Sequence, residues 1–142
     1  MAYENILFDW SFPANADLSA SQNRFVALNS SGKVAQVSTA GADAIGVLQD
    51  KPSAIDRTAQ VRVLGIAKVV AGAAIAAAAN VKSDNVGRAT TASMTAGDIV
   101  LGRALAAASA AGSRVRISCR GSRPQCRPGA SRRRCCCFSA SR

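Results

Sequence analysis

The sequence is organised around one apolar stretch, Gln60–Val81, whose two halves have different patterns. From Val61 to Val69 every second residue is apolar or glycine, and the intervening positions add Leu64 and Ile66. Because successive side chains of a strand point to opposite faces, this half predicts a central strand that is largely buried. In the second half, eight of the eleven residues from Ala71 to Val81 are Ala or Gly. Such small residues pack closely and carry no catalytic groups.

Turn-forming residues divide the chain into short apolar segments. Asn29–Gly32, Thr39–Asp43 and Lys82–Gly87 are rich in Gly, Asn, Asp and Ser, and similar turns recur every eight to fifteen residues. This spacing predicts an all-β fold, a small β-barrel or β-sandwich of short strands that ends in a strand over Arg114–Ser118. Alanine favours helix, so the alanine-rich runs 71–79 and 104–111 are the two places where a helical turn competes with this prediction.

The N-terminal residues 1–20 are predicted to form an extended arm. Four of the six aromatic residues of the chain, Tyr3, Phe8, Trp10 and Phe12, lie here. One interpretation is a strand docked on the core of its own chain. The other is an arm that anchors on a partner, since aromatic side chains bury a large area and freeze few torsions.

Charge divides the chain into a near-neutral body and a basic tail. Residues 1–112 hold nine basic and eight acidic residues, whereas residues 113–142 hold nine arginines, no acidic residue and all five cysteines. We therefore expect an arm (1–20), a β-rich domain (21–117) and an Arg/Cys-rich tail (118–142). The cysteine spacing includes no CxxC pair, which argues against a zinc site.

The body offers no chemistry for catalysis. The sequence has no histidine, its carboxylates are scattered singly, and no glycine-rich phosphate loop follows a strand. We therefore expect no enzyme activity, no cofactor and no metal site. The apolar runs are too short to cross a membrane, and the first twenty residues lack the basic residues of a secretory signal. We expect a protein made in the cytoplasm without a membrane partner.

An ordered series of short motifs resembles the capsid decoration, or cement, proteins of tailed bacteriophages. The resemblance covers roughly residues 1–117 and rests on the segments 44–49, 51–52, 61–69, 82–84, 87–89 and 100–105, together with Gly72 and Ile75. It implies a small β-rich virion protein on the outer surface of the capsid. It also implies homotrimers that bridge neighbouring major capsid proteins and stabilise the shell, with nucleic acid an improbable partner.

The candidate contact residues follow from these patterns. The capsid-contact candidates are Tyr3, Phe8, Trp10 and Phe12, and the subunit-contact candidates are Leu64, Ile66, Ala73, Ile75 and Ala76.

The tail departs from the family pattern. Its composition resembles an out-of-frame reading of GC-rich DNA. If it is functional, its basic residues, Arg132, Arg133 and Arg134 among them, could grip acidic patches on capsid subunits. The alternative function is a nucleic-acid-binding protein that acts through this Arg-rich tail, because clustered arginines neutralise phosphates without a fold.

Overall fold

The computed structural model describes residues 6–93 and 98–123, and in these ranges the chain is built from short β-strands with no α-helix. This confirms the predicted all-β fold class. The elements in chain order are β1 (Ile6–Pro13), the 3₁₀ turn η1 (Ser19–Ser21), β2 (Phe25–Leu28), β3 (Val34–Gln36), β4 (Gly46–Leu48), β5 (Thr58–Val70), β6 (Asn80–Ser83), β7 (Ala89–Thr91), β8 (Val100–Ala104) and β9 (Arg114–Arg123).

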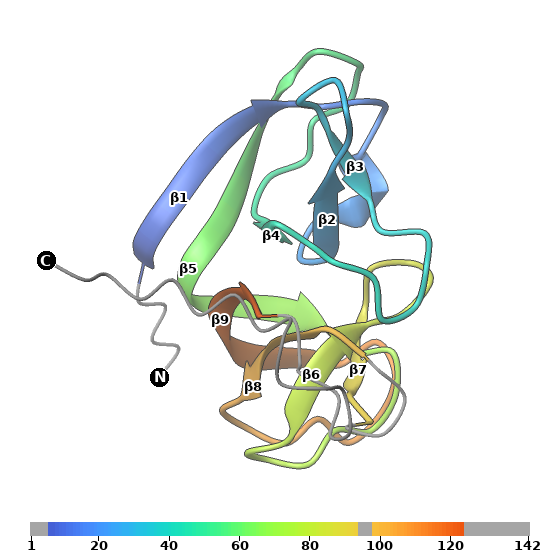
Figure 1. The fold of residues 1–142 in the computed structure, drawn as a ribbon. Helices are drawn as coiled ribbons and strands as arrows, with labels where there is room; N and C mark the ends of the chain where they lie inside the picture. The colour runs from blue at the N-terminus through green and yellow to red at the C-terminus, as the bar shows by residue number, and fades with distance from the viewer. Residues whose placement is uncertain (1–5, 94–97, 124–142) are drawn as a thin grey trace, which may run out of the picture.

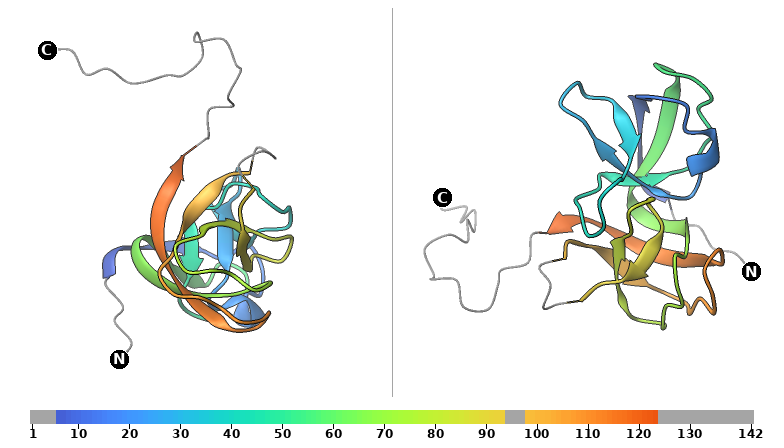
Figure 2. Two further views of the ribbon diagram at one scale, coloured as in Figure 1. Left: turned by 90° about the horizontal axis from the view of Figure 1, so that it is seen from below. Right: turned by 90° about the vertical axis from the view of Figure 1, so that its right-hand side faces the viewer.

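The strands form one antiparallel sheet that curls into a half-barrel with two lobes (Figures 1 and 2). The strand order is β3-β2-β4-β5-β9-β8-β6-β7, and β1 pairs with β5 outside this path. A bridge between Ala14 and Val34 brings the end of β1 to β3 in one lobe. A bridge between Ala71 and Ala89 brings the end of β5 to β7 in the other.

Strand β5 is the central strand, as its sequence pattern predicts, and it belongs to both lobes. Its first half pairs with β1 on one edge and β4 on the other, and its second half pairs with β9. The pairing with β1 ends and the pairing with β9 begins at Gly65, which lies opposite both Ile6 and Cys119. Gly65 has a φ of 119°. Because L-residues with a side chain rarely adopt this φ, glycine is suited to this position. Figure 1 shows that β5 bends as it passes from one lobe to the other.

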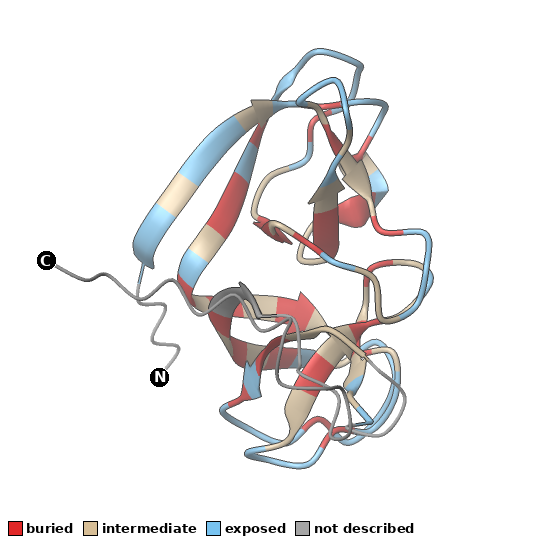
Figure 3. Ribbon diagram, in the orientation of Figure 1, coloured by how far each residue is buried: buried red, intermediate tan, exposed pale blue. Residues whose placement is uncertain are grey.

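Two apolar clusters fill the lobes, and Figure 3 shows buried residues on strands of both lobes. The smaller cluster includes Leu18, Val34, Leu48 and Val61. The larger cluster lies between β5, β9, β8, β6 and β7 and consists mainly of Val, Ile and Ala, as the aromatic-poor composition requires. Phe25 of β2 joins this larger cluster and so ties the first lobe to the second.

The two alanine-rich runs pair with each other and form no helix. Ile75 and Ala108 exchange two backbone hydrogen bonds of 2.9 Å, and Ala71, Ala104 and Ala108 are buried. The helical turns considered as an alternative for residues 71–79 and 104–111 are therefore absent. Tertiary pairing and the burial of small side chains outweigh the helix propensity of alanine here.

The last strand is longer than the sequence predicts. We expected it to end at Ser118, but β9 continues to Arg123 and pairs with both β5 and β8. Cys119 is buried in the larger cluster. Residues 118–123, which we assigned to the tail from their composition, therefore belong to the sheet. Composition could not predict this, because the pairing is made by the backbone and not by the side chains.

Candidate functional site

Strand β1, which pairs only with β5 among the described strands, carries a row of aromatic side chains. The ring centroids of Phe8 and Trp10 are 5.6 Å apart in an edge-to-face arrangement, and those of Trp10 and Phe12 are also 5.6 Å apart. Trp10 is 56% exposed and Phe8 48% exposed, whereas Phe12 is half-buried against the smaller cluster. These rings support one another, yet two of them remain open to solvent.

Further exposed apolar residues lie near this row in β1 and β5. Leu64 of β5 lies opposite Phe8 and is exposed, as are Ile6 and Leu7 at the start of β1, with Leu7 71% exposed. We call Ile6, Leu7, Phe8, Trp10 and Leu64 the β1 strip. Exposed apolar patches on a protein surface commonly mark interaction sites.

The strip stands on a strand that is firmly attached to its own lobe. β1 pairs with β5 from Ile6 to Pro13, with irregular register on either side of Phe8. Within the described residues, its other edge pairs with no strand. β1 is thus docked on its own core, as one interpretation of the arm expected, while it also presents exposed aromatic rings and a free edge.

The subunit-contact candidates are not equivalent in the structure. Ala73 and Ala76 are exposed in the loop after β5, and Ile66 is half-buried. Ile75 is only 2% exposed and packs in the larger core cluster, so its side chain is not available for a contact with another subunit. The sequence pattern cannot distinguish Ile75 from its neighbours, since burial there comes from the pairing with Ala108.

Several sequence candidates lie outside the described residues. They are Tyr3 of the arm and Arg132, Arg133 and Arg134 of the tail.

Four ion pairs join charged side chains within the described residues. Lys33–Asp56, Arg62–Asp9, Lys82–Asp98 and Arg88–Asp84 form ion pairs with N–O distances from 2.6 to 2.9 Å. A hydrogen bond from Lys82 lowers the pKa of Asp98, with help from the backbone N–H of Ser93. Residues 6–93 and 98–123 contain no group of three or more potential metal ligands.

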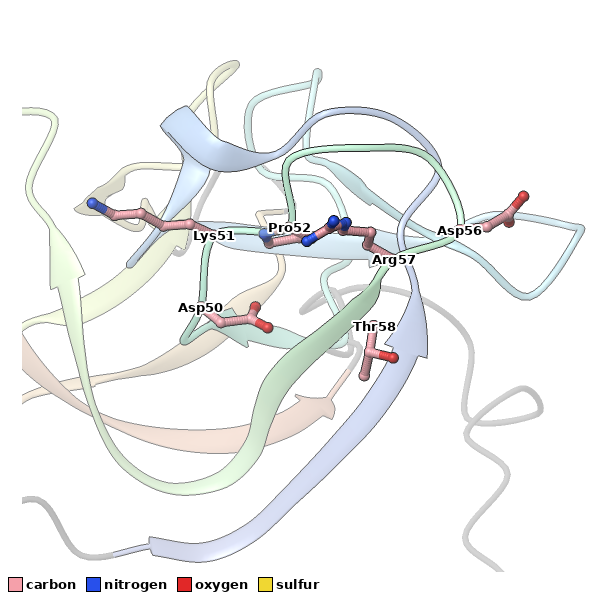
Figure 4. A pocket seen from close by; sticks show the side chains of 6 residues that line it. All are labelled: Asp50, Lys51, Pro52, Asp56, Arg57 and Thr58. Atoms are coloured by element: carbon pink, nitrogen blue, oxygen red, sulfur yellow. The ribbon is translucent and has the colours of Figure 1, made fainter.

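A depression between the start of β5 and the preceding loop has charged walls (Figure 4). Asp50, Lys51, Asp56 and Arg57 line it, with Pro52 and Thr58. Asp50 accepts a hydrogen bond from the backbone N–H of Gln60, and Asp56 pairs with Lys33. Lys51 and Asp56 point in opposite directions in Figure 4. The charges are thus balanced and do not converge on one point, which is poor geometry for acid–base chemistry.

Comparison with known proteins now decides the family. The sequence model of the phage cement proteins matches residues 10–119. The chain belongs to the phage cement protein family. The match includes β5 and two of the five residues of the β1 strip, Trp10 and Leu64, whereas Ile6, Leu7 and Phe8 precede it. Family membership makes this cement protein a structural component of the virion that associates with the phage capsid.

A solved structure has the same fold. The N base of the head fiber protein gp8.5 of bacteriophage phi29 superposes with a TM-score of 0.64 and 19% sequence identity. The match covers 83% of this chain and 99% of that chain. The comparison with curated proteins found no match. Among the described residues, no helix is long and apolar enough to cross a membrane.

Proposed function

We propose that this cement protein binds the outer surface of a phage head through the β1 strip and bridges neighbouring major capsid proteins. The observation that carries the proposal is the exposure of Phe8 and Trp10 on a strand whose backbone is already fixed. A preformed apolar surface loses little conformational entropy on binding, so most of the burial energy is available for attachment.

A modest free energy of attachment for each copy is enough on a lattice of many copies. Removing apolar surface from water is favourable by about 25 cal/mol per Å², but the lost freedom of the bound partners offsets much of this gain. The exposed edge of β1 also offers backbone N–H and C=O groups, which could add a strand of a capsid subunit by β-augmentation. Each copy then needs only modest affinity, because many attachments on one shell act together.

Self-association is the second part of the proposal. We propose that copies assemble as homotrimers and that Ile66, Ala73 and Ala76 contribute to their contacts. Ala73 and Ala76 are exposed and small, which permits close approach of a second backbone. Leu64 fits better with the β1 strip, because it lies opposite Phe8.

A sedimentation experiment with matched variants tests the capsid contact. Heads that lack this protein would be mixed with the wild type, Trp10→Ser or Ile55→Ser. Ile55 is 60% exposed in the loop between β4 and β5, so its substitution removes exposed apolar surface outside the β1 strip. We expect Trp10→Ser to lose most co-sedimentation and Ile55→Ser to retain it. Equal occupancy for both variants would refute the β1 strip as the anchor.

The same experiment addresses the tail. A chain that ends after Arg123 keeps β9, whereas an earlier end would remove a strand that pairs with both β5 and β8. We expect the shortened chain to bind heads. Loss of head binding together with loss of DNA binding would instead favour the nucleic-acid-binding alternative.

A further inference from the structure

A groove lies between the β2–β3 hairpin and the loop that leads to β4. Two hollows of about 250 and 210 Å³ adjoin here, and both are lined by Ala27, Leu28 and Asp43. Leu28 remains 45% exposed at this place. We call the surface the Asp43 groove, and its further apolar lining comes from Ala35, Val37, Ala42, Ala44 and Ile45.

Asp43 is the only charged residue among the described residues that line the groove. Its side chain is exposed and has no hydrogen-bond or ion-pair partner within residues 6–93 and 98–123. The ion pairs given above use Asp9, Asp56, Asp84 and Asp98 instead. An apolar groove with one unpaired carboxylate suits a protein surface that combines an aliphatic side chain with a cation.

The second lobe carries such a combination at Leu105 and Arg114, which we call the Leu105 knob. Leu105 is 50% exposed, and Arg114 is exposed with no partner in the part of the chain that the structure describes. The backbone N–H of Leu105 donates to the carbonyl oxygen of Arg116 at 2.8 Å, so Arg114 is its diagonal neighbour across the strands, at about 7–8 Å. Both side chains face outward, because the adjacent Ala104 and Val115 are buried.

The groove and the knob lie at opposite ends of β9. Arg114 is the first residue of this strand, and its last residue, Arg123, lies opposite Val100 of β8. Next to Val100, the backbone N–H of Ile99 donates to the carbonyl oxygen of Gly41, in the loop that forms the wall of the groove. The ten residues of β9 span about 30 Å along the strand. A contact between the groove and the knob therefore requires two copies of the chain.

We infer that copies of this protein associate head to tail, with the Leu105 knob of one copy seated in the Asp43 groove of the next. Leu105 enters the apolar hollows, and Arg114 pairs with Asp43 of the neighbouring copy. The inference rests on the self-association proposed above and names the two surfaces that make the contact. A contact of this kind joins different surfaces of identical chains, and it satisfies every copy when the chains close into a ring.

The knob borders residues that we have already proposed for contacts between subunits. The backbone N–H of Ala78 donates to the carbonyl oxygen of Ala104 at 2.9 Å, directly before Leu105 in the sequence. Ala73 and Ala76 are exposed in the same loop as Ala78. The head-to-tail contact can therefore extend from the knob onto this loop.

Charge reversal on the full-length protein tests the contact. Asp43→Lys places a cation in the groove, and Arg114→Glu places an anion on the knob. Lys51→Glu is the matched control, because Lys51 is exposed and without a partner among the described residues but lies in the loop before β5. Sedimentation velocity over a series of concentrations would measure self-association of each variant, of the double variant, and of an equimolar mixture of the first two.

We expect Asp43→Lys and Arg114→Glu each to self-associate about a hundredfold more weakly than the wild type, because like charges then face each other across the contact. Lys51→Glu should behave as the wild type. The equimolar mixture should recover association, since the altered groove of one variant meets the altered knob of the other with opposite charges. The double variant should recover it for the same reason.

Association of both single variants at the wild-type level would overturn the inference. A loss that neither the mixture nor the double variant restores would also overturn it, because Asp43 and Arg114 would then not face each other. If Asp43→Lys does not fold by circular dichroism, Asp43→Asn and Leu105→Ser replace it, and both should weaken association.

Failure of this inference is distinguishable from failure of the proposed function. If the wild type associates and the charge variants match it, these two surfaces are wrong and the proposed homotrimer stands. If the wild type is monomeric at every concentration, both the inference and the homotrimer are refuted. Attachment to heads is measured separately with Trp10→Ser, which should self-associate like the wild type.

Discussion

Arg62 and Asp9 form a bidentate ion pair that fastens β1 to β5. Nε and Nη2 of Arg62 donate to the two carboxylate oxygens at 2.9 and 3.1 Å, and Nη1 donates to the carbonyl oxygen of Ile66 at 3.1 Å. Arg62 is only 3% exposed. The pair therefore holds β1, the strand that carries most of the β1 strip, against β5.

Removing one partner of this pair should be costly. Asp9→Asn leaves a buried guanidinium without its counter-charge, and losses of about 3 to 5 kcal/mol are typical of such changes. We expect the midpoint of urea unfolding to fall accordingly. The double variant Asp9→Leu with Arg62→Met should recover much of the loss, because two apolar side chains need no charge compensation. An unchanged midpoint for Asp9→Asn would show that the pair contributes little.

Gly102, where β8 pairs with β9, should not tolerate the addition of even one methyl group. A Cβ on Gly102 of β8 would lie 2.4 Å from the carbonyl oxygen of Ser118 in β9, too close without a shift of backbone. Overpacking of this kind costs about 1 to 3 kcal/mol. We expect Gly102→Ala to lower the melting temperature and loosen the β8–β9 pairing in hydrogen exchange. An unchanged melting temperature for Gly102→Ala would show that the β8–β9 backbone shifts to admit the methyl group.

The buried thiol of Cys119 should be unreactive. Burial raises its pKa to about 12, so almost none of it is thiolate at pH 8. We expect iodoacetamide at pH 8 to leave Cys119 unlabelled in the native protein and to label it in urea, as judged by peptide mass mapping. Rapid native labelling would show that β9 does not stay paired.

The raised pKa of Cys119 also predicts that the free energy of unfolding declines between about pH 9 and 12, because the thiol ionises at lower pH in the unfolded chain than in the folded one.

Some features of this fold can be read from the sequence because they depend on local pattern. The alternation around Val61–Val69 predicts the central strand, and the recurrent turns predict the all-β class. The contacts that define the site are not local. Asp9 meets Arg62 only because β1 folds back onto β5, and Ile75 is buried only because it pairs with Ala108. Likewise, Lys68 and Arg116 become neighbours through the β5–β9 register, which no periodicity reveals.

The turn between β6 and β7 should lose stability in acid through Asp84. Burial alone would raise the pKa of Asp84, but hydrogen bonds from the backbone N–H groups of Arg88 and Val86 and the pairing with Arg88 lower it below the usual 3.8. Since the folded pKa is below the unfolded one, this stabilisation is present above pH 3.8 and is lost as pH falls through the lowered value. Asp84→Asn keeps a side-chain acceptor but has no charge to lose. We therefore expect the wild type to exceed Asp84→Asn in unfolding free energy by about 1 to 2 kcal/mol at pH 7. That difference should shrink towards pH 2 in urea titrations, whereas a difference independent of pH would mean that the carboxylate charge has no role in this turn.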